Sequence, residues 1–209
     1  MKTNGSLLYA YNVGASGVAG ATVNGVAFLA YAFASNYSSQ TITVGSASMT
    51  ESPGWLVSSN TMGGSSAPFT SLSSGYQTLL GSLGSASNAT SITVAFGGLT
   101  SGQQYLVQWW ANNSANGTID GLGLNNTTAT SGPNSVTLDA NTTNVAGGLG
   151  QYVTGTFTAA GTSQTMVLAA SGSDTPLISA FQVRAVPEPS SLALVAAACG
   201  ALGLRRRRK

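Results

Sequence analysis

The side chains that could carry out acid–base or nucleophilic chemistry are few in this chain of 209 residues. It contains no histidine, which excludes Ser-His-Asp and Cys-His arrangements and the common zinc sites. Its single cysteine, Cys199, can form no disulfide within the chain. Neither a Gly-x-Ser-x-Gly nucleophile turn nor a phosphate-binding glycine-rich loop is present. The remaining possibility is a pair of carboxylates, the arrangement that glycoside hydrolases use.

Four acidic residues precede the C-terminal tail: Glu51, Asp120, Asp139 and Asp174. Nothing in their spacing pairs any two of them. Each has a simpler interpretation as a turn or surface acid, since Asp120 precedes a glycine and Asp174 precedes Thr-Pro. We therefore expect a protein that is not an enzyme. A carboxylate-dependent glycan-cleaving enzyme is the alternative from another functional class.

Asparagines near Asp120 raise the possibility of a metal site, because carboxylate and amide oxygens are ligands that Ca²⁺ accepts. These asparagines are Asn112, Asn113, Asn116, Asn125 and Asn126. Their spacing matches no EF-hand loop, and an Asx-rich turn that satisfies its own backbone explains them more simply. We expect no metal and no cofactor, with calcium near Asp120 as the less favoured alternative.

Exposed aromatic rings are the side chains on which sugars stack. Trp109 and Trp110 are adjacent in a strand pattern, so they point to opposite faces; one is expected in the core, and Trp110 is the candidate for the outer face. Trp55 and Tyr37, in loop-like surroundings, are further sugar-stacking candidates. Burial in the core is the favoured interpretation for these rings, and sugar stacking is the alternative.

The last 24 residues have three consecutive parts. Val186-Pro187-Glu188-Pro189 is a stiff, extended linker, because proline fixes φ and restricts the residue before it. The run from Ser191 to Leu204 is uncharged, but as a helix it reaches only about 21 Å against a hydrocarbon core of about 30 Å. Five cations close the chain and favour the cytoplasmic side: Arg205, Arg206, Arg207, Arg208 and Lys209. The tail is therefore expected to act as a transient membrane anchor.

This three-part tail resembles the PEP-CTERM sorting signal of Gram-negative envelope proteins. The resemblance implies recognition by an exosortase-type membrane protease, with cleavage near Pro187-Glu188-Pro189. It also implies transit through the inner membrane with the body outside the cytoplasm, then the cell envelope or extracellular matrix. Such a protein needs an export signal, and we expect it upstream of Met1, because the first residues lead directly into a strand pattern.

Composition points to a β-rich body with little charge. Only 6% of residues are charged, 43% are hydrophobic, and residues 1–185 have two cations against four acids. Such a body cannot neutralise a row of phosphates, so nucleic-acid binding is not expected. Disorder by composition needs high charge and low hydrophobicity, and neither holds. About 185 residues suffice for one domain, which gives the expected division into a β-sandwich, 1–185, and a sorting signal, 186–209.

Period-two alternation predicts strands at 7–13, 22–34, 40–49, 90–99, 105–110, 135–140, 151–159, 163–170 and 177–184. The strands at 90–99 and 105–110 are predicted to form a hairpin across Thr100-Ser101-Gly102. Leucine spacing between residues 71 and 83 predicts one short helix. The fold class is therefore all-β, an antiparallel jelly-roll-like β-sandwich with one short helix, followed by a single transmembrane-like helix in the tail.

The body also resembles PEP-CTERM proteins with a galactose-binding-like jelly roll. The resemblance rests on residues 23–28, 99–109, 150–159 and the closing strand 179–184. It implies a saccharide-binding or accessory module without identifying binding residues. We expect a structural or adhesive protein that makes many weak contacts with extracellular polysaccharide. A carbohydrate-binding module with an aromatic platform is the alternative.

Overall fold

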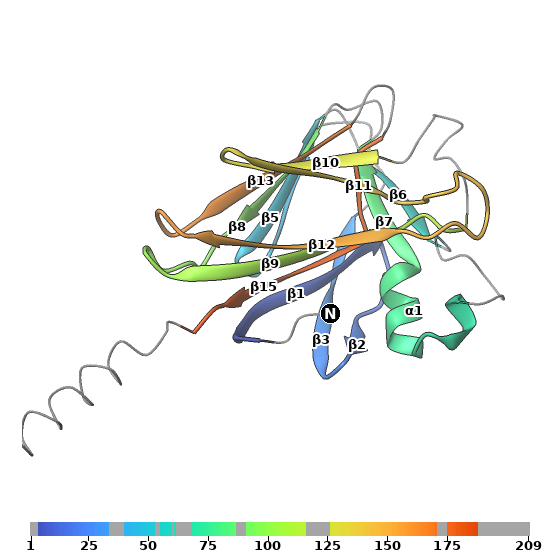
Figure 1. Ribbon diagram of the computed structural model, residues 1–209, viewed down its shortest axis with the longest axis horizontal. Coiled ribbons are helices and arrows are strands. Elements are labelled where there is room, and N and C mark those ends of the chain that lie inside the picture. Colours follow the sequence, from blue (N-terminus) through green and yellow to red (C-terminus); the bar gives the residue numbers. More distant parts are fainter. Residues whose placement is uncertain are drawn as a thin grey trace, which may run out of the picture.

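Two six-stranded β-sheets pack face to face in the computed structural model (Figure 1). The model describes residues 4–33, 40–52, 55–59, 61, 68–86, 91–115, 126–170 and 175–187. A three-stranded sheet and one short helix complete the described structure. The predicted all-β sandwich with one short α-helix is confirmed. Within the described ranges, no helix is long and apolar enough to cross a membrane, and the apolar run Ser191 to Leu204 lies outside those ranges.

The first sheet has the order β12-β9-β15-β1-β3-β2. In that order its strands are Gln151–Thr158, Gln104–Ala111, Ala180–Ala185, Ser6–Ala15, Val26–Phe33 and Ala21–Val23. One neighbouring pair, β1 and β3, is parallel, so the prediction of a purely antiparallel sandwich is wrong at this point. The short strand β2 carries the chain to the sheet edge, and β3 then returns between β2 and β1 in the direction of β1.

The second sheet has the order β11-β10-β13-β8-β5-β4 and is antiparallel throughout. In that order its strands are Asn134–Asp139, Asn126–Ser131, Gln164–Ala170, Ser91–Phe96, Ala47–Ser52 and Gln40–Val44. The small third sheet consists of β14 Leu177–Ile178, β7 Ser82–Ala86 and β6 Trp55–Ser59.

Three sequence predictions of strand layout are wrong. The stretches 22–34 and 40–49 each span part of a hairpin, with turns at Asn24-Gly25 and Gly45-Ser46. Asn24 and Gly25 both have positive φ, 49° and 77°, as a two-residue hairpin turn requires. The predicted hairpin between β8 and β9 does not form, because β8 belongs to the second sheet and β9 to the first. The turn at Thr100-Ser101-Gly102 carries the chain from one sheet to the other.

The helix α1, Ser74–Leu80, lies within the predicted range but is shorter. Ser73 caps it by accepting a hydrogen bond from the Tyr76 backbone N–H at 3.3 Å. A 3₁₀ helix, η1, Phe69–Ser71, precedes it. Gly81 ends the helix, and Leu83, which the leucine spacing had placed in the helix, belongs to β7.

The main core lies between the inner faces of the two large sheets and is rich in aromatic rings. Tyr11 is at its centre, with ring centroids 5.3 Å from Tyr31 and 5.5 Å from Phe181. A second, smaller core covers the other face of the first sheet, where Trp110 and Phe28 pack against Leu79 of α1. The first sheet is therefore buried on both faces over part of its area, which fixes the position of β9 and β15.

Candidate functional site

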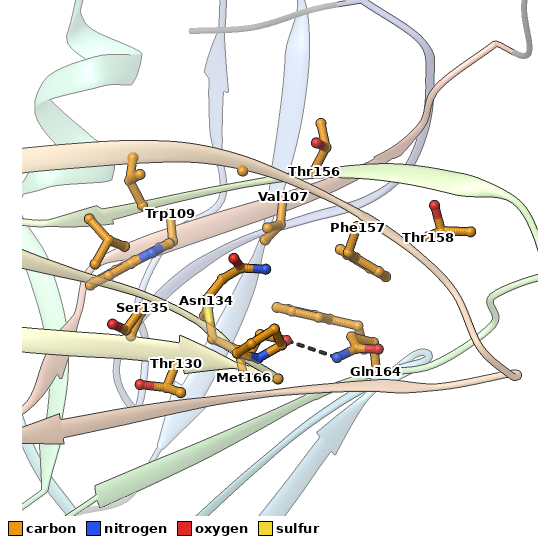
Figure 2. A pocket seen from close by; sticks show the side chains of 18 of the residues that line it. Val107, Trp109, Thr130, Asn134, Ser135, Thr156, Phe157, Thr158, Gln164 and Met166 are labelled. Atoms are coloured by element: carbon orange, nitrogen blue, oxygen red, sulfur yellow. Dashed lines mark hydrogen bonds between the residues drawn. The ribbon is translucent and has the colours of Figure 1, made fainter.

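An open cleft of about 680 Å³ runs between the two large sheets along their β11 and β12 edges (Figure 2). One wall comes from β9 and β12, and includes Val107, Trp109 and Phe157. The other wall comes from β8, β10, β11 and β13, and includes Asn134 and Met166. The volume of the cleft lies in the range of about 300–1,000 Å³ that is typical of small-molecule sites.

The cleft exists because small side chains face each other where larger ones would close the sandwich. Gly155, at the middle of β12, pairs with Val107, and a Cβ added to Gly155 would meet only the Val107 side chain, at 3.8 Å. Opposite, Ala129 of β10 pairs with Val136 of β11, which remains 37% exposed. An apolar side chain is thus left facing the open space instead of a packed core.

Aromatic rings form a firm apolar wall inside the cleft. Phe157 stacks on Tyr105, with centroids 5.7 Å apart and an interplanar angle of 26°. It also stacks on Phe96 at 6.4 Å and 18°. Phe157 is only half-buried, whereas Phe96 and Tyr105 are buried beneath it. The exposed part of the Phe157 ring is therefore held in one orientation by two buried rings.

Amide and hydroxyl groups line the rim of the cleft. Gln164 Nε2 donates a hydrogen bond to Ser131 Oγ at 2.8 Å, and Ser131 Oγ donates to the Thr165 carbonyl at 2.8 Å. Figure 2 shows Gln164, Asn134 and Thr130 on the wall opposite Val107 and Trp109. These groups come from β10, β11 and β13, so sheet pairing fixes their spacing.

Electrostatically, the cleft is neutral. None of the described residues that line it is acidic, basic or a histidine. A charged ligand group entering it would lose hydration without gaining a counter-ion, which is costly. The described lining residues suit an uncharged ligand with one apolar face and several hydroxyl groups.

Trp110, the candidate for sugar stacking, is only 1% exposed, so its ring is a core residue and is not available to a ligand. The expectation that Trp109 and Trp110 point to opposite faces is correct, but α1 and β2 cover the outer face, so both rings are core residues. Trp110 Nε1 donates a hydrogen bond to Tyr76 Oη at 2.9 Å. Burial raises the pKa of Tyr76, and this hydrogen bond lowers it by a smaller amount. Tyr152, whose ring lies 6.2 Å from Trp110, is the exposed ring at this surface, at 53%.

The other two stacking candidates cannot be placed against the cleft. Tyr37 and the side chain of Trp55 lie outside the described residues. The backbone of Trp55 begins β6, so this residue is in a strand and not in the loop that the sequence indicated. Among the aromatic residues that line the cleft, the half-buried Phe157 was missed. Gly155 was the available signal, because a glycine inside a strand marks a close approach or an opening.

The acidic residues in the described ranges do not form a catalytic pair. Glu51 is 1% exposed on β5, which corrects its interpretation as a turn or surface acid. Asp139 ends β11 and accepts a hydrogen bond from the Asn141 backbone N–H at 2.8 Å, as expected for a turn acid. The strands β5 and β11 are four places apart in the sheet, about 19 Å at about 4.8 Å per strand. Glycosidase carboxylates lie about 5–10 Å apart. Asp120 and Asp174 lie outside the described residues.

Two of the asparagines weighed as calcium ligands have structural partners. Asn112 is 2% exposed, and its Nδ2 donates to the carbonyls of Thr61 at 3.0 Å and Leu80 at 2.9 Å. Asn113 is also buried, and its backbone N–H donates to the Ala140 carbonyl at 2.8 Å. Asn126 begins β10, while Asn116 and Asn125 lie outside the described residues, as does Asp120.

The structure describes the junction with the tail up to Pro187. The Val186 backbone N–H donates to the Gln104 carbonyl at 2.8 Å, and Gln103 Nε2 donates to the Val186 carbonyl at 2.6 Å. The rest of the predicted sorting motif, Glu188 and Pro189, and the basic residues 205–209 lie outside the described residues.

Residues 185–209 match the PEP-CTERM protein-sorting motif. The resemblance inferred from the Pro-Glu-Pro linker, the apolar run and the basic end is thereby confirmed. A sorting motif of this kind implies an exported protein that passes the membrane to the cell envelope or the extracellular space. No curated protein matches the chain in sequence.

The sandwich is similar to parts of two larger chains and to most of a third chain. A plant receptor-like kinase, FER, matches with a TM-score of 0.55 and 13% identity over 88% of this chain and 43% of that chain. A β-glucuronidase 2 from Bacteroides uniformis matches with a TM-score of 0.52 and 10% identity over 86% of this chain and 18% of that one. A family 35 carbohydrate-binding module from Clostridium thermocellum matches with a TM-score of 0.36 and 12% identity over 66% of this chain and 90% of that chain. The first two likenesses establish a shared β-sandwich fold.

Proposed function

We propose that this chain is a non-catalytic structural or adhesive protein of the cell envelope or matrix that holds neutral polysaccharide in the cleft between its sheets. The cleft is the observation that carries the proposal. Its half-buried Phe157 ring offers a flat apolar surface, and sugar rings present a matching apolar face of C–H groups. The amides and hydroxyls opposite, including Asn134 and Gln164, are placed to bond sugar hydroxyls.

The described residues that line the cleft carry no charge, which narrows the class of ligand. Uronic acids and sulfated sugars would have to bury an anion against a wall without a cation, so neutral hexose or pentose units are favoured. The cleft lies between the β11 and β12 edges of the two sheets and is partly open to solvent, so we expect it to admit a chain end or an internal unit of a polysaccharide. Many copies displayed on one surface would then hold a polymer through avidity, with weak binding at each cleft.

The tail supplies the cellular context of the proposal. Its motif match supports export and sorting. The chain would cross the inner membrane, be held briefly by the run Ser191 to Leu204, and be released by an exosortase-type membrane protease acting near Pro187-Glu188-Pro189. The body would then remain in the envelope or matrix. A transient anchor suits this role because the apolar run is shorter than a comfortable span.

A panel of neutral and uronate-containing oligosaccharides tests the cleft. We expect the protein to bind neutral members selectively and Phe157→Ala to lose most of that binding. Tyr152→Ala is the matched control, because it removes an aromatic ring from the same strand on the opposite face. Loss of binding with Tyr152→Ala alone would assign the sugar to an aromatic platform on the outer face. Binding to no saccharide, or preferential binding of uronates, would refute the neutral cleft.

A second candidate is adhesion without a defined site. The outer face of β12 presents Thr154, Thr156 and Thr158 in line, and hydroxyls displayed this way can make many weak contacts with a polymer. This candidate predicts similar weak binding across the panel and no effect of Phe157→Ala. The two candidates therefore differ in both selectivity and response to the same variant.

A further inference from the structure

We propose that β12 is a self-association edge, at which the β12 strands of two copies of this chain pair antiparallel and join their first sheets into one. Among the strands that the structure describes, β12 ends the first sheet and pairs only with β9 (Figure 1). The inference does not depend on saccharide binding, although it brings a second copy to the mouth of the cleft.

The four strands that end the two large sheets differ in their protection against pairing with another chain. An edge strand presents a row of backbone N–H and C=O groups, and short length, charge, proline or a bulge normally blocks it. The strands β2 and β4 are short, with three and five residues. The strand β11 directly follows Pro133 and ends at Asp139, whose backbone N–H already donates to Gln151 Oε1.

The strand β12 has none of these protections. Its eight residues, Gln151–Thr158, pair with β9 without a bulge. The strand contains no charged residue and no proline, and most of its residues are threonine, tyrosine, valine or phenylalanine, which favour strands. Among the described edges, β12 is therefore the one that is open to another strand.

Alternate residues of β12 direct their backbone groups away from the sheet. The Ala159 N–H, just past the strand, donates to the Gln103 carbonyl at 3.0 Å. Hydrogen-bonded pairs alternate in an antiparallel ladder, so the odd-numbered residues of β12 bond to β9. The backbone groups that point outward are those of the even-numbered residues, Tyr152, Thr154, Thr156 and Thr158.

One antiparallel register uses all four outward residues. It pairs Tyr152 with Thr158 of the second copy and Thr154 with Thr156 of the second copy, and each such pair exchanges two hydrogen bonds. The two-fold axis then passes at Gly155, which faces Gly155 of the second copy. A shift of register by two residues would leave outward groups unpaired, so this register is favoured.

The side chains of β12 are compatible with this register. Phe157 lies opposite Val153 of the second copy, in a pair of the closely spaced, non-hydrogen-bonded kind. The second copy thereby adds a side chain to the apolar wall of the cleft. No like charges meet, because β12 carries none. A contact made of one strand pair is small, so we expect a weak dimer that depends on protein concentration.

A single cysteine at the two-fold axis tests the register. Gly155→Cys, made in a Cys199→Ser background of the full chain, places two thiols opposite each other at a Cα separation of about 4.5 Å, which a disulfide can span. Val153→Cys is the matched control on the same strand and face, because it would lie about 14 Å from its own copy. We expect mild oxidation to give a disulfide-linked dimer with Gly155→Cys and none with Val153→Cys. Equal yields in the two variants, or no dimer in either, would overturn the pairing.

Proline variants measure the association without a covalent link. Thr156→Pro removes an outward N–H and leaves the bonds to β9 in place, as an edge strand allows. Thr137→Pro is the matched control at the edge of the second sheet, because Thr137 has the same outward direction as Asp139, two residues on, whose N–H bonds to Gln151. The tail is present in every protein compared, so association through the tail cannot separate the variants.

Sedimentation velocity of the full chain at concentrations up to about 1 mM covers weak self-affinities. We expect the wild type and Thr137→Pro to approach twice the monomer mass, and Thr156→Pro to lose this association. A wild type that stays monomeric would overturn the proposal and leave the edge to a strand from a different protein. A dimer that Thr156→Pro leaves intact would assign self-association to another surface and overturn it as well. If Thr156→Pro does not fold, the cysteine variants still decide.

Discussion

Replacing Trp110 by alanine should destabilise the fold strongly. The ring is 1% exposed in the small core between β9 and α1. A buried aromatic side chain removes about 150–250 Å² from water, which corresponds to about 4–6 kcal/mol at about 25 cal/mol per Å². That figure is an upper bound, because the unfolded chain already buries part of this surface. Measured truncations of buried Phe and Trp cost about 3–5 kcal/mol.

Two specific contacts add to the loss. Trp110 packs edge-on against Phe28 at 5.7 Å and 80°, an arrangement that contributes about 0.5–1.5 kcal/mol. Its Nε1–H bond to Tyr76 Oη disappears, leaving the half-buried hydroxyl with one bond fewer. We expect Trp110→Ala to lower the free energy of unfolding by about 4 kcal/mol. Typical domains have only about 5–15 kcal/mol of stability, so the variant should be close to unfolding at room temperature.

Urea unfolding followed by far-ultraviolet circular dichroism measures this difference without relying on tryptophan fluorescence. Tyr152→Ala is the control, because its ring is 53% exposed and should contribute about 1 kcal/mol or less. A loss below about 1 kcal/mol for Trp110→Ala would contradict the buried position. It would favour the alternative role of Trp110 as a surface ring for sugars.

Three further predictions concern pH and packing. Burial raises the pKa of Tyr9 and Tyr31 above the ordinary value near 10, so folding favours their neutral hydroxyl groups. The stability that the neutral groups contribute is complete below about pH 10 and is lost as pH rises further. Urea midpoints measured from about pH 8 to 12 should therefore fall only above about pH 10. Arg184→Ala removes bonds to Gln182 and the Gly5 carbonyl in a buried setting, and should cost about 2–3 kcal/mol in urea unfolding; an unchanged midpoint would contradict this. Gly148→Ala would place a Cβ 1.7 Å from Asn141 Oδ1, so faster hydrogen exchange is expected in the 141–150 loop, and unaltered exchange would show that the loop can adjust.

The fold class and many of the strands were predictable from sequence because alternation is visible wherever a strand has one buried face. In β8, for example, Ile92, Val94 and Phe96 are buried and the residues between them are half-exposed. The signal disappears in β7, Ser82–Ala86, which is buried at every residue and built largely from small side chains. The alternation of apolar and polar residues also continues across Asn24-Gly25, so the sequence predicted one long strand there. The Asn-Gly turn signal should have divided it into β2 and β3.

The candidate site was much less predictable, because it depends on which strands become neighbours. A turn after β8 does not reveal whether the chain folds back in the same sheet or crosses to the other, and the wrong choice misplaces β9 and hence Val107. The cleft combines residues from β8 to β13 that no local pattern connects. The sorting motif was readable for the opposite reason, since all of its parts are consecutive in the chain.

Binding of a neutral oligosaccharide by proteins with a filled and an unfilled cleft tests the proposed function most directly. Gly155→Val adds an isopropyl group inside the cleft, where its Cβ would meet only the Val107 side chain at 3.8 Å, and Gly161→Val adds the same group where a Cβ has nothing within 4 Å. Isothermal titration calorimetry with the neutral saccharide selected from the panel should show binding to the wild type and to Gly161→Val. In Gly155→Val, binding should be weakened at least about tenfold, a loss of about 1.4 kcal/mol, while the protein stays folded. Equal affinity in all three proteins would show that the saccharide does not occupy the cleft.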